Sequence, residues 1–167
     1  APAYDEAAVQ HAQKLAQKKP FSGCPGMRAK QFQRSTAPAA GAACPSQLSQ
    51  WPVQIKLAGV MAPYFDDADL LIAADCTAYA YGNFHEKFIR GRITLIGCPK
   101  LDAVDYAEKL TAIFAAHSIR SVTVARMEVP CCGGIEQAVQ RAIAASGKAI
   151  SCHVTVIGTD GTIQEER

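Results

Sequence analysis

Short runs of aliphatic and β-branched residues alternate with segments of helical periodicity from Trp51 to the end of the chain, and this alternation restricts the fold more than any other feature. Such runs predict buried strands, and the segments between them predict helices that cover a mostly parallel sheet. The predicted strands are Val53–Leu57, Leu70–Ala74, Ile93–Ile96, Ser121–Ala125 and His153–Ile157. We therefore expect a three-layer, doubly wound α/β domain with a mostly parallel sheet of about five strands.

Two longer helices are expected after the third and fourth predicted strands. In Ala103–His117 the apolar residues share one helical face, and Asp102 is placed to cap its first turn. Gly134–Ser146 has a similar apolar stripe, and the glycine at position 147 is placed to end it. A shorter helix is predicted near Phe84–Ile89. Each longer helix should bury its apolar stripe against the sheet.

The first fifty residues differ in character from the rest. With 167 residues, of which 49% are apolar, the chain is long enough for one compact domain and an extension. Tyr4–Lys18 predicts a helical arm whose lysines and glutamines fit a solvated face or a contact in a homodimer. A loop around Cys24 and a stretch of linker composition follow. We expect the arm, loop and linker over residues 1–50 and the α/β domain over residues 51–167.

Charge and hydropathy argue against two kinds of partner. The 17 basic and 15 acidic residues give a net charge of +2 and are interspersed, so nucleic acid is not expected. No apolar run approaches the roughly 20 residues that cross a bilayer. The segment APAYDEAAVQHAQKLAQKK also lacks the apolar centre of a secretory signal. The expectation is a soluble, cytoplasmic protein without a membrane partner.

Four of the seven cysteines directly follow predicted strands. In a reducing cytoplasm a disulfide framework is not expected, which leaves metal ligation, redox chemistry or burial. Cys76 follows the second strand, Cys98 the third, and the adjacent Cys131 and Cys132 the fourth. Because the carboxyl ends of parallel strands share one edge, where open sheets bind ligands, these thiols should converge. Three strand ends that carry cysteine favour a functional cluster over separate core residues.

The residues next to these cysteines suit anionic sulfur. Pro99 and Lys100 follow Cys98, and the lysine charge favours a thiolate. Gly133 and Gly134 follow the cysteine pair at a predicted helix start, where free backbone N–H groups can donate to a metal–sulfur centre. The competing interpretation of Cys132 is a small residue packed under the turn.

One histidine and three further cysteines complete the set of candidates. His85 could ligate a metal, donate to a sulfide or carry a proton, or it could be a surface imidazole. Cys24 lies in a Gly-Cys-Pro-Gly loop that could fold over the edge of the sheet, although such pairs are also ordinary turn residues. Cys44 is interpreted as incidental. Cys152, at the start of the last predicted strand, is interpreted as a core residue.

The succession GCPG, LSQWPVQIKL, APYF, ADLLIAADCTAYAYGNFHEKFIRGR, GCPKLD and MEVPCCGG resembles a family of small iron–sulfur cluster-binding proteins of anaerobic bacteria and archaea, often described as 4Fe-4S ferredoxin-type proteins. The resemblance implies a bound iron–sulfur or similar centre, a role in electron transfer or redox sensing, and a redox protein as partner. The cysteines at the family's motif positions are Cys24, Cys76, Cys98, Cys131 and Cys132. The separate ferredoxin segment that many members carry is absent from this sequence.

Three classes of function stay open. Four thiolates commonly hold one cubane, so five candidates exceed the need of a single cluster. The leading expectation is a cluster-binding redox module, more a carrier of electrons than a catalyst. The second is a metalloenzyme whose centre keeps an open position for a small substrate. The third is a metal-free thiol-redox or nucleotide-binding domain, which the absence of Cys-x-x-Cys and of glycine-rich phosphate loops disfavours. Zinc could occupy the same thiols.

Overall fold

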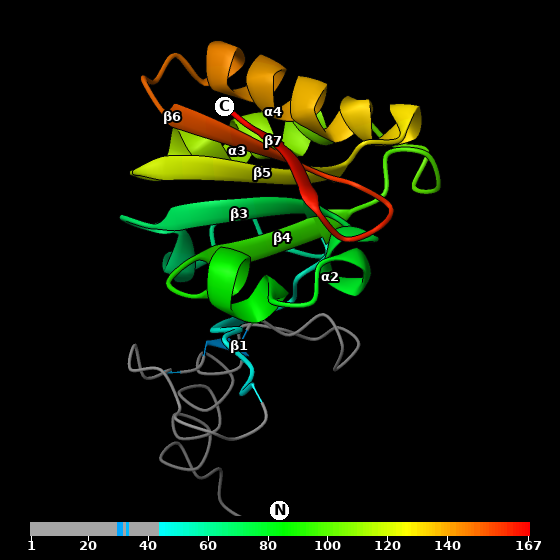
Figure 1. Ribbon diagram of the computed structural model, residues 1–167. Helices are drawn as coiled ribbons and strands as arrows, with labels where there is room; N and C mark the ends of the chain where they lie inside the picture. The colour runs from blue at the N-terminus through cyan, green and yellow to red at the C-terminus, as the bar shows by residue number, and fades with distance from the viewer. Residues whose placement is uncertain (1–29, 32, 34–43) are drawn as a thin grey trace, which may run out of the picture.

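The computed structural model describes residues 30–31, 33 and 44–167. The predicted helical arm and the Cys24 loop lie outside these residues. Within the described part, a five-stranded sheet has the strand order β4-β3-β5-β6-β7, with helices on both of its faces (Figure 1). Its strands are β3 (Asp69–Ala74), β4 (Ile93–Gly97), β5 (Ser121–Met127), β6 (Ser151–Ile157) and β7 (Ile163–Glu166). A separate short ribbon pairs β1 (Lys30–Gln31) with β2 (Gln50–Trp51).

The sheet is parallel except for β7, which pairs antiparallel with β6. Of the five predicted strands, four are confirmed. The first in the chain, Val53–Leu57, is wrong. That segment makes one parallel bridge to β4, in which Ile96 N–H donates to the Val53 carbonyl (2.7 Å) and Ile55 N–H donates to the Ile96 carbonyl (2.9 Å). It then turns, because the N–H groups of Leu57 and Ala58 both donate to the carbonyl of Gln54.

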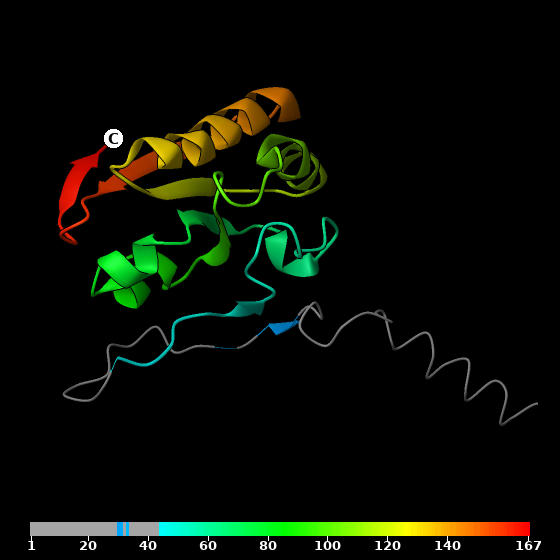
Figure 2. The ribbon, with the colours of Figure 1, turned by 90° about the vertical axis from the view of Figure 1, so that its right-hand side faces the viewer.

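Helices cover the two faces of the sheet, which confirms the three-layer, doubly wound architecture. One face carries α3 (Tyr106–Ala116) and α4 (Gly133–Ser146), and the other carries α2 (Thr77–Ala80) and the π-helical turn η3 (His85–Ile89), as Figure 2 shows. The 3₁₀ turns are η2 (Pro63–Phe65) and η4 (Pro130–Cys132). Gly147 ends α4 in the left-handed conformation with φ of 70°, as predicted. No helix among the described residues is long and apolar enough to cross a membrane.

The cap of α3 differs from the prediction. The carboxylate of Asp105, not that of Asp102, accepts the N–H of Ala107 at 2.9 Å. The carboxylate of Asp102 instead accepts the hydroxyl of Tyr106. The helix therefore starts three residues later than its apolar periodicity suggested, since Ala103 has a φ of 49° that an α-helix does not accommodate.

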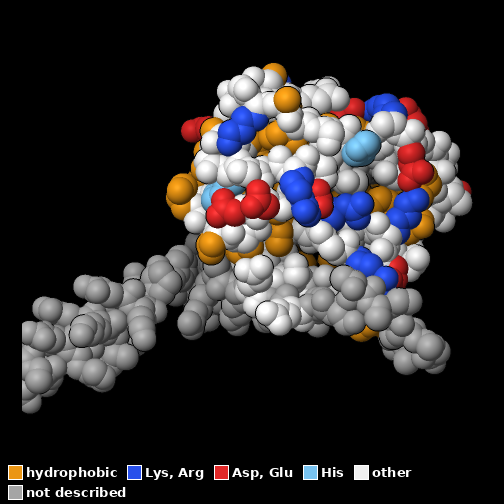
Figure 3. All heavy atoms as spheres, turned by 90° about the vertical axis from the view of Figure 1, so that its left-hand side faces the viewer, with side chains coloured by type: hydrophobic (Ala, Val, Ile, Leu, Met, Phe, Trp, Pro, Cys, Tyr) orange, Lys and Arg blue, Asp and Glu red, His pale blue; other side chains and the backbone are white. Residues whose placement is uncertain are grey.

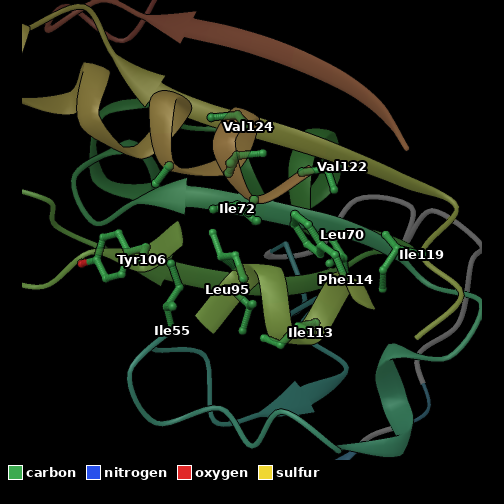
Figure 4. Packing of buried hydrophobic residues seen from close by; sticks show 14 of the residues in the cluster. Ile55, Leu70, Ile72, Leu95, Tyr106, Ile113, Phe114, Ile119, Val122 and Val124 are labelled. Carbon is green, nitrogen blue, oxygen red and sulfur yellow. The ribbon is translucent and has the colours of Figure 1, made fainter. Parts of the chain in front are cut away.

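Side chains of the central strands alternate between two apolar layers. Leu70 and Ile72 of β3 point toward α3 and α4, where they meet Phe114 and Val124 in the larger layer (Figure 4). Leu71, between them, packs with η3 on the opposite face. Strands that are buried on both faces read as continuous apolar runs, which explains why the sequence identified them. The packing fixes the carboxyl ends of β3, β4 and β5 along one edge.

A partly buried ion-pair cluster ties α4 to the sheet and carries a prediction. The Glu136 carboxylate accepts Arg126 Nε at 2.7 Å and Arg167 Nη2 at 2.6 Å, and 12% of its side chain is exposed. Burial opposes ionisation, but hydrogen bonds from Arg167 and Arg126 hold the pKa of Glu136 below its ordinary 4.5. We expect Glu136→Gln to lower the free energy of unfolding by about 1–3 kcal/mol, because two cations lose their counter-charge.

The same cluster predicts a pH dependence. A lowered folded-state pKa means that the carboxylate stabilises the fold above pH 4.5 and that this stabilisation is lost as the pH falls through the folded-state value. Urea unfolding at pH 7 and at acid pH measures both effects. The exposed Asp67→Asn is the control, with a change within about 0.5 kcal/mol. Equal stability of Glu136→Gln and the parent at pH 7 would contradict the assignment.

Candidate functional site

The adjacent strands β3 and β5 send the chain to opposite faces of the sheet. After β3 the chain enters α2 and η3 on one face, and after β5 it enters α4 on the other. Such a reversal between neighbours opens a crevice at their carboxyl ends, where open α/β sheets bind ligands. Figure 2 turns this edge toward the reader. Cys76 follows β3 here, and Cys131 and Cys132 follow β5.

The structure brings three of the predicted thiols together at this crevice. Cys132 is 5% exposed, whereas Cys76 and Cys131 are exposed. Burial raises the pKa of the Cys132 thiol, and a backbone hydrogen bond from Met127 partly opposes this. The charge of Cys131, a hydrogen bond between the two adjacent thiols, and the charge of Cys76 raise it further. The thiols of Cys76 and Cys131 thus lie close enough to Cys132 to disfavour its ionisation.

Cys98 lies on the far side of β3 and is only partly buried. Its carbonyl accepts the N–H of Asp102 at 3.0 Å. Pro99 holds this loop against the start of α4, where a Cβ added to Gly134 would lie 3.1 Å from the Pro99 Cβ. Among the described residues no interaction joins the Cys98 thiol to the other three. The loop is therefore near the thiol group, but its sulfur is not in contact with it.

Both predicted glycines begin α4, but they differ in their surroundings. Gly134 permits the close approach of Pro99, which agrees with the close backbone approach predicted for this glycine. A Cβ at Gly133 would meet no described atom within 4 Å. The N–H of Gly133 is not free as predicted, because η4 runs directly into α4 and this N–H donates to the carbonyl of Pro130.

A carboxylate and phenol network beside the thiols was not predicted as a unit. Burial raises the pKa of Asp75, the charge of Asp102 raises it further, and a hydrogen bond from Gln54 partly opposes both. Burial, the hydrogen bond to Asp102, and the charges of Asp102 and Asp75 raise the pKa of the Tyr106 hydroxyl. One Asp75 oxygen, Oδ1, is buried without a hydrogen-bond partner among the described residues. Burial and mutual charge thus raise the pKa values of Asp75 and Tyr106 next to Cys76.

Gly97 makes room for this network, which gives a second prediction. A Cβ at Gly97 would lie 2.5 Å from Tyr106 Oη and 2.7 Å from Cζ, and Tyr106 is 2% exposed. We expect Gly97→Ala to lower the free energy of unfolding by about 1–3 kcal/mol, because the ring has no room to move aside. Gly82→Ala is the matched control, since an added Cβ there meets nothing within 4 Å. Denaturant unfolding that does not separate the two variants would contradict the packing.

The remaining candidates lie away from the thiols or outside the described residues. His85 Nδ1 accepts the backbone N–H of Gln47 at 3.0 Å, so the imidazole attaches the segment before β2 to η3. Cys152 is partly buried and packs against the larger apolar layer, and burial followed by the charge of Glu136 raises its pKa. Cys44 is exposed. Cys24 lies outside the described residues.

The positions of the side chains do not form a complete ligand set by themselves. Within the described part of the chain, no group of three or more His, Cys, Asp or Glu residues is arranged to hold a metal ion. The exposed thiols of Cys76 and Cys131 are not packed against the core, so their side chains can change rotamer without a cost in packing.

Comparison with known proteins gives a family for the fold. A protein of Archaeoglobus fulgidus, described only as "uncharacterized protein", is 28% identical over 118 residues, which cover 71% of this chain and 84% of that relative. No solved structure matches the chain significantly. A family described as "Rossmann-like domain" matches residues 62–167. Since this match covers more than half of the chain and agrees with the parallel sheet and its two helical layers, the protein belongs to the Rossmann-like domain family.

Proposed function

We propose that this protein binds a thiophilic metal centre, in the first place an iron–sulfur cluster of the 4Fe-4S type, at the carboxyl edge of its sheet. The centre would serve electron transfer to a partner protein or redox sensing. The observation that supports the proposal most is the proximity of Cys76, Cys131 and Cys132, which come from two separate strand ends. Sulfur-only donors favour iron–sulfur clusters, zinc and other soft metals.

Electrostatics explains why these thiols would take a cation. Together, burial and neighbouring thiols keep the pKa of Cys132 high, so the metal-free group resists ionisation. A bound metal supplies the positive charge that lets coordinating thiols lose their protons. The amino end of α4, directly after Cys132, adds a favourable helix dipole toward anionic sulfur.

The thiol donors fit such a centre once their side chains rearrange on metal binding. Cys76 and Cys131 are exposed and would turn toward the centre, and Cys98 lies on the loop that Pro99 holds against α4. Cys24 remains a predicted ligand. An iron–sulfur centre supplies one-electron chemistry when bound. Asp75, next to Cys76, would set the negative charge around it.

Metal analysis of protein purified without oxygen tests the proposal. Iron and acid-labile sulfide in near-equal amounts, with broad visible absorption, are the expected result. Zinc without sulfide would support the thiol site but would identify a zinc centre in place of the cluster. A folded, colourless protein that stays metal-free after anaerobic incubation with iron and sulfide would contradict the proposal.

A second candidate is a metal-free thiol-redox domain, and the hydrogen bond between the thiols of Cys131 and Cys132 favours it. The adjacent thiols would then be oxidised and reduced together. A thiol count on metal-free protein, before and after a mild oxidant, checks this. Loss of two thiols, reversed by a dithiol and absent in Cys131→Ser, would support the candidate. An unchanged count would exclude it.

A further inference from the structure

A second cleft, of about 390 Å³, opens on the face of the sheet that carries η3. Its lining comes from η3, from Arg92 before β4, from Thr123 of β5, from His153–Thr155 of β6 and from the end of the chain at Glu166 and Arg167. In Figure 1 η3 lies in front of the sheet and away from α2, toward the amino ends of the parallel strands. The cleft is therefore separate from the thiols, and its volume lies in the range of small-molecule sites.

The floor of the cleft is polar where the rest of that face is apolar. In β5, Thr123 shares a face with the core residues Ala125 and Met127, and in β6, Thr155 shares a face with Ile157. The two threonines are only 8% and 6% exposed. Among the described residues neither hydroxyl has a hydrogen-bond partner. Nearly buried hydroxyls are normally paired, so these two are available to a ligand.

Cationic and imidazole groups surround this floor. The Nη1 of Arg92 donates to the carbonyls of Lys87 (3.1 Å) and Phe88 (2.9 Å), which fixes the guanidinium in position. No described residue accepts from its other nitrogens. His153 also lines the cleft and has no partner among the described residues. Figure 3 shows several Lys and Arg side chains, with Asp and Glu among them, on the side of the molecule at the amino ends of the strands.

One carboxylate occupies the rim. Glu166 Oε1 lies 2.8 Å from Lys87 Nζ, and the side chains are 55% and 36% exposed. An ion pair this exposed contributes at most about 1 kcal/mol. A ligand with its own negative charge can therefore replace Glu166 as the partner of Lys87 at little cost.

We infer that this cleft binds a small molecule through a phosphate monoester group. The donors are the guanidinium of Arg92, the ammonium of Lys87, the imidazole of His153 and the hydroxyls of Thr123 and Thr155. A carboxylate has roughly four acceptor sites, fewer than these five donor groups. The three terminal oxygens of a phosphate monoester each accept more than one hydrogen bond, so they can bind all five groups. The volume leaves room for the organic part of the ligand. This inference does not depend on the proposed metal centre.

Calorimetric titration with phenyl phosphate, and with inorganic phosphate, tests the inference on the whole chain. Saturable binding of phenyl phosphate is expected. Arg92→Gln and Thr123→Val should each weaken it at least about tenfold, the loss of one charge-assisted or buried hydrogen bond. Glu166→Gln should strengthen it, because the competing carboxylate is removed. Arg120→Gln, whose partner is Asp69 outside the cleft, is the matched control and should leave it unchanged.

Arg92→Gln and Glu166→Gln are expected to change the affinity in opposite directions, which separates an effect on binding from a loss of folding. A general loss of folding weakens binding in every variant, and Glu166→Gln would then not bind more tightly. Thr123→Val also leaves the carbonyls of η3 capped by Arg92, so it reports on the floor alone. Absence of saturable binding at millimolar ligand would overturn the inference. Equal affinity of the parent, Arg92→Gln and Glu166→Gln would also overturn it, and so would binding of inorganic phosphate with no dependence on these residues.

Discussion

The double variant Cys76→Ser/Cys131→Ser is expected to abolish nearly all binding of the proposed metal centre. These two thiols come from the neighbouring strand ends of β3 and β5, so their removal takes ligands from both sides of the crevice. Loss of residues that only support a ligand costs about 10–100-fold in metal affinity, and loss of two ligands should exceed that range. Iron and sulfide per folded chain, after anaerobic reconstitution, give the measurement.

Two cysteines of the same chain supply the controls. Cys44 is exposed like Cys76 and Cys131, and Cys152 packs against the core on β6. Cys44→Ser and Cys152→Ser should keep the metal content of the parent. Cys98→Ser should lower it less than the double variant, because its loop is near the other thiols without contact between sulfurs. Full metal content in the double variant, with intact folding, would refute the site.

Acid should release the proposed metal centre from protein loaded with iron and sulfide. Thiol ligands must be deprotonated, and the pKa of Cys132 is raised by burial and by its neighbours, so protons compete strongly with the metal. Occupancy should therefore fall as the pH is lowered, before the fold is lost. Absorbance and circular dichroism recorded on the same sample separate release from unfolding. Metal that remains bound until the protein unfolds would argue against thiolate ligands.

Phe114→Ala is expected to remove about 3–5 kcal/mol of the free energy of unfolding. Phe114 is fully buried in the larger apolar layer between α3 and the sheet, in the cluster that Figure 4 shows with Leu70 and Ile119. Its truncation leaves a cavity that the surrounding strands cannot close without moving the sheet. Domains of this kind have about 5–15 kcal/mol in total, so the variant should be marginal at room temperature.

Tyr79→Ala is the control for that prediction. Tyr79 is 93% exposed on α2, so its loss should change stability by no more than about 0.5 kcal/mol. Urea unfolding of both variants gives the comparison. A cost below about 1.5 kcal/mol for Phe114→Ala, half the lower limit for a filled core position, would show that this layer is loosely packed.

The strands were predictable because burial on both faces leaves a continuous apolar run, as in Leu70–Ala74. Val53–Leu57 was misassigned because alternating apolar residues there serve one bridge and a turn rather than a ladder. Conversely, β7 (Ile163–Glu166) was missed because three of its four residues are polar and exposed at the sheet margin. Local pattern thus identified burial, and it failed where pairing depends on the neighbouring strand.

The candidate site likewise has features that follow from the chain order and features that depend on tertiary contacts. Chain topology alone placed Cys76 next to Cys131 and Cys132, since cysteines after parallel strands must share an edge. The role of Tyr106 was not predictable, because its position in α3 fits a core residue and only the fold brings its hydroxyl to Asp102. The contact of His85 with Gln47 likewise depends on how the chain before β2 crosses η3.

Differential alkylation tests the central claim most directly. Iodoacetamide labelling of metal-free and reconstituted protein, read by peptide mass spectrometry, reports each thiol separately. Cys44, Cys76 and Cys131 are all exposed, so all three should label in the metal-free protein. In the reconstituted protein we expect Cys76 and Cys131 to be protected while Cys44 still labels at its former rate. Equal labelling of Cys76 and Cys131 in the two forms would contradict a metal centre at the carboxyl edge of the sheet.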